Sequence, residues 1–439
     1  MSTKRVSAKI LPGFRDFFAE EVSVREYVTN TFKKVFEKYG YEPLETPALE
    51  YTDIFSSEAG EEAEKLFYRF KDQGGRDIML KYEVMISMCR AVAENINKIP
   101  FPYKRYQIQK VWRADKPQKG RYREFTQCDA DTIGSDSVIA DAEFIQMGIE
   151  VLRTLRFDKF RANISNRKFL NGIVQYVGGT DETYIPICLS IDKLPKIGGE
   201  AVKKELIEKR RIPTEVAEKI LKIVTLKGDT DELLKKLKVQ LKTNQTAMEG
   251  LSELEQIFYY LKMSQVSNQN YIFAPYIARG LAYYTGPIWE FEILEGDVGS
   301  IAGCGRYDNT IGNFVGRRVP ATGGSFGIER IVEVIKDRKM FNTNSTMTKV
   351  LITFFDSSTL AKTVEVANLL RKENISTMFY PDPSKLDKQL KYADKKGIPY
   401  VIIVGPDEVE KNVVKLKNMK TGQQEEVTVN ELVIKLKSS

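Results

Sequence analysis

The chain has 439 residues, a formal net charge of +7, four cysteines and no histidine. A length of this order predicts about two or three domains. A composition of 42% apolar and 29% charged residues is that of a folded globular protein. Without histidine there is no Ser-His-Asp triad, no His-ligated zinc and no histidine proton shuttle. Any chemistry must therefore use Arg, Lys, Asp, Glu, Gln and Tyr side chains and backbone groups.

The cysteines and the apolar pattern bear on the cell compartment. Cys89, Cys128, Cys188 and Cys304 lie far apart and form no C-x-x-C pair. Neither a zinc site nor a disulfide framework is expected, and a reducing cytoplasm is predicted. No segment approaches the roughly 20 apolar residues of a membrane helix, and the first ten residues lack the apolar core of a signal peptide. The mild positive charge permits a nucleic-acid partner without establishing one.

The first third of the chain predicts helices combined with antiparallel hairpins. A turn at residues 11–16 precedes a helix whose apolar stripe ends at Gly40, followed by an extended segment to Pro47. Two hairpins are expected, and a helix follows them from about residue 137 to 155. The hairpins pair residues 66–70 with 78–82, and residues 103–112 with 124–133.

The rest of the chain changes character twice. Residues 167–259 predict a mostly helical, lysine-rich segment. Strands are expected at 271–277 and 288–294, and a glycine-dense region then leads to a helix that begins near Ile328. After a polar linker, residues 350–437 alternate strands and helices in βαβαβ order, which predicts a small α/β domain with a mostly parallel sheet.

The stretch from Val111 to Gln127 carries the most chemical information. Alternation along its two strands places Arg113, Phe125 and Gln127 on a common face. A guanidinium there can clamp a phosphate with two hydrogen bonds, and an aromatic ring can stack on a base. The same composition also fits a solvated basic hairpin.

Two further stretches combine glycine with Arg and Tyr. Residues 279–286 place Arg279 beside the paired tyrosines Tyr283 and Tyr284, which suggests a planar ligand in a close-walled pocket. Residues 302–308 and 323–330 are glycine-rich, which permits close approach of a ligand to the backbone. G-x-G-x-x-G spacing after a strand is missing, so a dinucleotide-binding fingerprint is excluded. Glycine-rich structural turns are the alternative.

Taken in order, these residues resemble the histidyl-tRNA synthetases, a family of class II aminoacyl-tRNA synthetases. Pro47 resembles motif 1, the arginine hairpin motif 2 and residues 323–330 motif 3. Residues 279–284 and 303–308 resemble the two histidine-specific motifs, and residues 386–394 resemble part of an anticodon-binding domain. The resemblance covers nearly the whole chain.

The resemblance implies an α/β protein built from three parts and a homodimer joined at motif 1. Residues 1–166 and 260–341 are expected to form an α+β catalytic domain on an antiparallel sheet of the class II synthetase type. Residues 167–259 are expected to form a helical insertion, and residues 348–439 a C-terminal α/β anticodon-binding domain.

The resemblance also implies the reaction and its residues. The family activates L-histidine with ATP and Mg²⁺ to histidyl-adenylate, then transfers it to the 3′ terminal adenosine of tRNA-His. Arg113 and Arg279 match the catalytic arginines, and Gln118 and Lys119 match the contact to the tRNA acceptor end. The ATP-binding positions are Arg113, Arg121, Phe125 and Arg330. The histidine-binding positions are Glu83, Val84, Met85, Arg113, Gln127, Asp131, Arg279, Tyr283, Tyr284 and Tyr307.

Three residues depart from the family pattern: Met85 stands for Thr, Cys304 for Gly and Ala282 for Asp. Met85 and Cys304 add bulk near the expected pocket, which motivates a paralogue with altered amino-acid choice as one alternative. A synthetase-like regulatory subunit of ATP phosphoribosyltransferase is another. The presence of the C-terminal segment and of all three motif arginines favours the enzyme.

Overall fold

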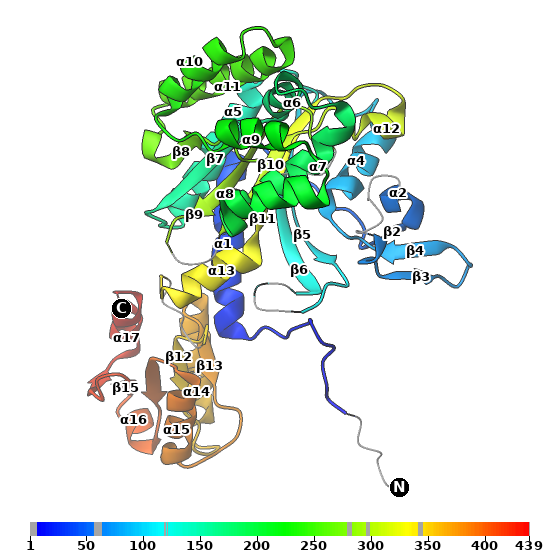
Figure 1. Cartoon of the computed structure of the whole chain (residues 1–439). Helices are drawn as coiled ribbons and strands as arrows, with labels where there is room; N and C mark the ends of the chain where they lie inside the picture. Colours follow the sequence, from blue (N-terminus) through cyan, green and yellow to red (C-terminus); the bar gives the residue numbers. More distant parts are fainter. Residues whose placement is uncertain are drawn as a thin grey trace. The chain divides into compact units, whose positions relative to one another are not determined.

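The computed structural model describes residues 7–56, 64–117, 120, 122–278, 283–295, 299–340 and 346–438. It divides the chain into two compact units, residues 1–15 with 25–340 and residues 16–24 with 341–439. Figure 1 shows their helices and strands, with labels on most of them. Within the described residues, no helix is long and apolar enough to cross a membrane.

The core of the larger unit is an eight-stranded sheet of order β1-β5-β6-β11-β10-β9-β7-β8 (Figure 1). The outermost pairs, β1 with β5 and β7 with β8, are parallel, and all the pairs between them are antiparallel. The predicted hairpin of residues 103–112 and 124–133 forms with those bounds. In sheet order the strands are β1 (Glu42–Pro43), β5 (Tyr103–Trp112), β6 (Glu124–Ile133), β11 (Ala321–Gly327), β10 (Ser300–Arg306), β9 (Pro287–Ile293), β7 (Phe160–Asn166) and β8 (Tyr271–Phe273).

Both glycine-rich runs are central strands, so their interpretation as turns is wrong. β10 and β11 pair with each other, and β11 also pairs with β6. A Cβ atom added at Gly323 would overlap the carbonyl oxygen of Ala130, and one added at Gly324 would overlap the sulfur of Cys304. Glycine is therefore present because neighbouring atoms already fill the space that a side chain would occupy, and not because the chain bends there.

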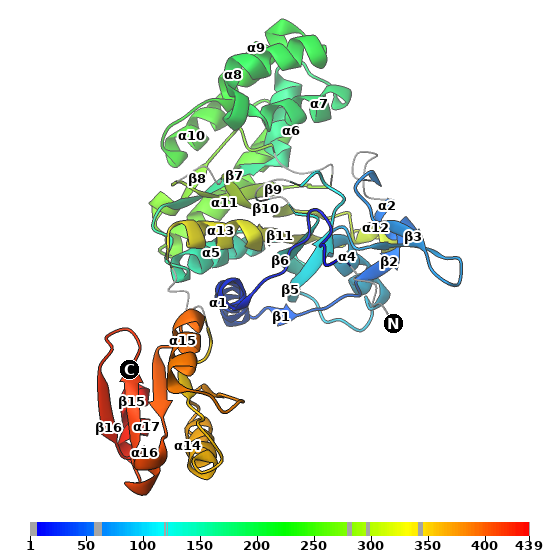
Figure 2. The ribbon, with the colours of Figure 1, turned by 90° about the horizontal axis from the view of Figure 1, so that it is seen from below.

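Helices α1, α5, α11 and α13 cover one face of this sheet (Figure 2). The apolar stripe predicted for the first helix is buried, and its Phe32 ring lies 4.9 Å from that of Phe326 on β11. Gly40, with φ of +79°, follows the end of this helix, because glycine adopts the left-handed conformation without strain. The four helices are α1 (Ala19–Lys38), α5 (Ile139–Thr154), α11 (Gln245–Met263) and α13 (Ile328–Asp337).

A small antiparallel sheet of order β2-β4-β3 packs beside the main one. It contains the predicted first hairpin with shorter strands, because pairing is confined to the residues next to the turn at Gly75. Its elements and their neighbours are β2 (Leu49–Tyr51), α2 (Thr52–Ser56), β3 (Arg69–Lys71), β4 (Asp77–Leu80), α4 (Val84–Glu94) and α12 (Gly312–Val315).

The segment after β7 is helical, as predicted. Figure 2 shows these helices as a group beside the sheet edge that ends in β7 and β8. They are α6 (Arg167–Tyr176), α7 (Asp181–Ile191), α8 (Leu194–Lys204), the π-helix η1 (Glu205–Lys209), α9 (Thr214–Val224) and α10 (Thr230–Gln240), before α11; the 3₁₀ turn η2 (Asn268–Asn270) follows α11.

The second unit contains a five-stranded sheet of order β13-β12-β14-β15-β16. The predicted βαβαβ order is confirmed, but the sheet is only partly parallel. β15 and β16 run antiparallel, because short connections return the chain directly and a parallel crossover needs more residues. The elements are β12 (Val350–Ile352), α14 (Leu360–Lys372), β13 (Thr377–Phe379), α15 (Leu386–Lys396), β14 (Tyr400–Ile403), α16 (Pro406–Glu410), β15 (Val414–Asn418), β16 (Gln424–Val427) and α17 (Val429–Ser438).

Lys81, which follows β4, gives stability a pH dependence that can be measured. Its buried ammonium donates to the side chain of Gln109 (2.6 Å) and to the carbonyl oxygen of Thr46 (3.1 Å). Burial lowers the pKa of Lys81 to about 8, against roughly 10.4 for an unfolded lysine. Between these values the unfolded chain holds a proton that the folded chain has lost, so Lys81 makes the free energy of unfolding rise with pH.

We therefore expect the wild-type protein to gain stability relative to Lys81→Met as the pH is raised from about 7 to about 9.5. Urea unfolding of both proteins across this range measures the difference in free energy of unfolding. The comparison between the two proteins cancels the titration of all other groups that behave alike in both. A difference that stays constant with pH would contradict the lowered pKa.

Candidate active site

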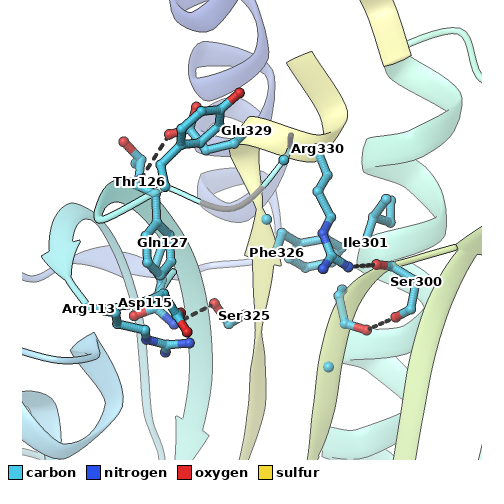
Figure 3. A pocket seen from close by; sticks show the side chains of 16 residues that line it. Arg113, Asp115, Thr126, Gln127, Ser300, Ile301, Ser325, Phe326, Glu329 and Arg330 are labelled. Atoms are coloured by element: carbon cyan, nitrogen blue, oxygen red, sulfur yellow. Dashed lines mark hydrogen bonds between the residues drawn. The ribbon is translucent and has the colours of Figure 1, made fainter. Parts of the chain in front are cut away.

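A cavity of about 240 Å³ opens between the β5–β6 hairpin, β10, β11 and the first turn of α13. In Figure 3, Arg113 and Gln127 border it on one side, and Arg330, Ile301 and Ser300 border it on the other. Two cationic side chains therefore meet at one cavity, although they are more than two hundred residues apart in the sequence.

Arg113 lies directly after β5 and is held before any ligand arrives. Its backbone N–H donates to the carbonyl of Arg123 (2.9 Å), and its side-chain Nε donates to the carbonyl of Tyr82 (3.1 Å). The guanidinium carbon lies 4.3 Å from the ring centre of Tyr82 and 5.1 Å from that of Phe125. Its orientation is thus preorganised, which is what favours stabilisation of a developing charge.

Phe125 and Gln127 border the same cavity as Arg113, so the predicted common face is confirmed. Gln127 spans two elements: its Oε1 accepts from the backbone N–H of Val84 (3.1 Å), and its Nε2 donates to the hydroxyl of Ser325 (3.2 Å). These bonds fix the first turn of α4 against β6 and β11.

Glu329 positions the helix that carries Arg330. It is buried, and its carboxylate accepts two bonds from Arg25 on α1 and one from the backbone N–H of Thr126 (3.0 Å). Arg330 then donates to the carbonyl of Ser300 (2.5 Å), as Figure 3 shows. Sequence reasoning assigned no role to Glu329 or Arg25. Glu329 stands beside Arg330 in the motif, whereas the sequence offers no signal for Arg25.

The other predicted residues gather beyond Gln127. Glu83 precedes α4 in an extended conformation, and Met85 is buried in a cluster that contains Tyr307. Tyr283 packs against that cluster, 4.5 Å from the ring of Tyr284 and 6.4 Å from that of Tyr307. Burial raises the pKa of Tyr283, so its phenol stays neutral and can donate a hydrogen bond.

Asp131 lies at the base of this tyrosine cluster, on β6. Tyr307 donates its hydroxyl to Asp131, and Arg105 on β5 forms an ion pair with the same carboxylate. Asp129, two residues earlier, is also buried, and burial raises its pKa to about 8. The family resemblance proposed Asp131, and the sequence contained no signal for Arg105, because the contact between the two residues depends on the register of two strands.

Several predicted residues lie outside the described part of the chain, so nothing is concluded about their positions. They are Arg121, Arg279, Gln118, Lys119 and Ala282. The remaining ones form two adjoining groups. The cavity joins fixed arginines and an aromatic wall, which suits an aromatic ligand that carries phosphate. The neighbouring group joins neutral phenols and carboxylates, which suits a ligand with N–H donors.

Known proteins match the chain along most of its length. A family model described as histidyl-tRNA synthetase matches residues 13–331, and one described as an anticodon binding domain matches residues 349–439. The histidine–tRNA ligase of Cytophaga hutchinsonii is 38% identical over 97% of this chain and 98% of that protein.

Solved structures share the fold. The crystal structure of histidyl-tRNA synthetase from Nostoc sp. PCC 7120 has a TM-score of 0.88 and 29% identity, and covers 99% of this chain and 100% of that one. A structure described as an ATP phosphoribosyltransferase regulatory subunit/histidyl-tRNA synthetase from Bacillus halodurans C has a TM-score of 0.74 at 19% identity, and covers 89% and 97%. The expected α/β fold of the class II type is confirmed, and the chain belongs to the histidyl-tRNA synthetase family.

Proposed function

We propose that the protein is an aminoacyl-tRNA ligase that activates L-histidine with ATP and transfers it to the 3′ terminal adenosine of tRNA-His. Family membership supports the reaction. The main observation is the position of Arg113, which is fixed between the rings of Tyr82 and Phe125 at the cavity. Gln127 borders the same cavity and accepts from the backbone N–H of Val84, so it joins the cavity to the acidic and tyrosine-rich group.

Activation brings two anions together, because the carboxylate of histidine attacks the α-phosphorus of ATP and pyrophosphate leaves. Fixed cations lower the barrier by stabilising the charge that develops in the transition state. We assign this role to Arg113 and Arg279. ATP arrives as its Mg²⁺ complex, with the adenine on Phe125 and the triphosphate toward Arg121 and Arg330.

Histidine would bind beyond Gln127, in the second group. A pocket of buried polar groups rejects side chains that leave those groups unpaired, by roughly 10⁴-fold or more. Glu83 and Gln127 would receive the ammonium group, and Asp131 would accept from the imidazole. The rest of the pocket wall would come from Val84, Met85, Tyr283, Tyr284 and Tyr307.

The same proposal assigns the partners and the parts of the chain. Residues 1–166 and 260–341 would carry the chemistry, residues 167–259 would form an insertion, and residues 348–439 would read the anticodon. Gln118 and Lys119 would contact the tRNA acceptor end. The active species would be a cytoplasmic homodimer. Exposed apolar side chains of the small sheet, among them Leu49, Tyr51 and Phe70, support an interface there.

The test is ATP–pyrophosphate exchange with each amino acid in turn. We expect exchange with histidine, because the cavity and the acidic group adjoin through Gln127. Exchange with a different amino acid would select the paralogue, which the buried Met85 beside the tyrosine cluster motivates. A folded protein that exchanges with none would contradict the enzyme and favour the regulatory subunit.

A further inference from the structure

A row of polar side chains lies on β5 and β6, on the face of the sheet that carries Asp131 of the proposed histidine pocket. We call this row the ladder. Strands β5 and β6 pair Arg105 with Asp131, Gln107 with Asp129, and Gln109 with Gln127. Alternation places all these side chains on one face of the sheet. Arg105 is 0% exposed and Asp131 is 2% exposed. A guanidinium so deeply buried is costly unless it is paired, so its partners indicate its purpose.

In the ladder, Arg105 uses one terminal nitrogen for Gln107 and the other for Asp131. Arg105 donates to Oε1 of Gln107 (3.4 Å), whose Nε2 donates to the hydroxyl of Thr46 (2.7 Å). Gln109 extends this series of hydrogen bonds, because its side-chain oxygen accepts from the ammonium group of Lys81 (2.6 Å). The guanidinium is therefore oriented by a buried network that contains none of the residues assigned to ATP.

Arg105 faces the carboxylates of the pocket. It forms an ion pair with Asp131. Burial raises the pKa of both Asp131 and Asp129, and the charge of Arg105 opposes that rise. The other ionisable side chains around this ion pair are phenols and one thiol: Tyr307, Tyr284, Tyr41, Tyr103 and Cys89. Phenols and thiols carry no positive charge in either protonation state, so Arg105 supplies the positive charge of the group.

We propose that Arg105 is a positioning residue for histidine recognition. It keeps the carboxylate of Asp131 ionised and aimed so that it accepts an N–H from the substrate imidazole. Arg105 does not touch the substrate in this scheme and acts through Asp131. The inference rests on the proposed function, because it assigns a support to the acid that the function places on the imidazole.

The experiment measures the KM for histidine and for ATP by pyrophosphate exchange. We expect Arg105→Gln to raise the KM for histidine on the order of 30-fold, as for loss of a hydrogen bond to a charged group, with the KM for ATP within about two-fold of wild type. Without Arg105 the pKa of Asp131 rises, so the defect is expected to shrink between about pH 7 and about pH 8.5, where free imidazole is already neutral.

A double-mutant cycle tests whether Arg105 acts through Asp131. Asp131→Asn alone and combined with Arg105→Gln are expected to have similar KM values for histidine, because the arginine has nothing left to position. The control is Lys104→Gln, on the opposite face of the same strand and paired with Glu143 (2.6 Å). It is expected to leave the KM for histidine unchanged.

Arg105→Lys provides a second test in case Arg105→Gln does not fold. It keeps the charge but loses the planar fork, so its KM for histidine is expected to rise at least three-fold and less than that of Arg105→Gln. A KM for histidine within two-fold of wild type in every folded variant at Arg105 would overturn the inference, as would an equal rise in both KM values. Wild-type protein without histidine exchange would instead contradict the proposed function.

Discussion

Arg113→Gln is expected to lower kcat for histidine-dependent pyrophosphate exchange by about 10³-fold, the size seen when one preorganised donor to a developing charge is lost. The residue is held by the carbonyl of Tyr82 and by two aromatic rings. Its position is therefore set in the free protein, and stabilisation of the transition state needs no reorganisation. The measurement is single-turnover adenylate formation together with steady-state exchange.

Lys110→Gln is the matched control for that prediction. Lys110 is on β5, three residues before Arg113, but its side chain is 55% exposed and pairs with Glu124 at 2.7 Å. Exposed pairs contribute little, so kcat is expected to stay within about two-fold. An Arg113→Gln enzyme with kcat near the wild-type value and only a raised KM for ATP would show that Arg113 binds ground-state ATP and does not act on the chemical step.

Arg306→Met is expected to lower the free energy of unfolding by about 3–5 kcal/mol, the usual cost of leaving one charge of a buried pair alone. Arg306 donates through Nε and Nη2 to Asp141 (3.1 and 2.5 Å) and through its terminal nitrogens to the carbonyls of Ser135 and Ser137. Asp141 is buried and also accepts from Thr322 (2.7 Å). Removing the arginine takes from this carboxylate its paired cation and two hydrogen bonds, and from both carbonyls the donor that Arg306 supplies.

Urea unfolding followed by circular dichroism measures this loss. Arg318→Gln serves as the control, because Arg318 also pairs with two carboxylates, Asp136 and Asp308, but its side chain is 51% exposed. Its replacement is expected to cost less than about 1 kcal/mol. Equal losses for the two variants would mean that burial does not decide the cost of breaking an arginine pair in this protein.

Local patterns in the sequence predicted a large part of the fold. The alternation of residues 103–112 and 124–133 and the loop between them predicted the β5–β6 hairpin with its observed bounds. The apolar stripe of α1 and its stop at Gly40 were likewise readable. These features depend on neighbours along the chain, so one short window contains the information that specifies them.

Two features of the sheets were missed, because each depends on how the strands pair. β10 and β11 contain too much glycine to be recognised as strands, and they are strands because they pair with each other and with β9 and β6. Ala130 and Cys304 leave no room for side chains at Gly323 and Gly324 of β11. The C-terminal sheet is mixed, because short connections return β15 beside β14 and β16 beside β15 in antiparallel direction. The pairings of β10 and β11 join segments that lie far apart in the sequence, whereas those of β15 and β16 join segments that are close in it.

The sequence alone determined the kinds of chemistry open to this protein. Its lack of histidine excluded histidine-based catalysis, and its ordered motifs identified Arg113, Phe125, Gln127 and Arg330 as residues of one site. Only the tertiary structure decided what supports them. Arg105 forms an ion pair with Asp131 across two strands. Arg25 donates to Glu329 between two helices. Strand register and helix packing bring these charges together, and burial then makes each partner depend on the other.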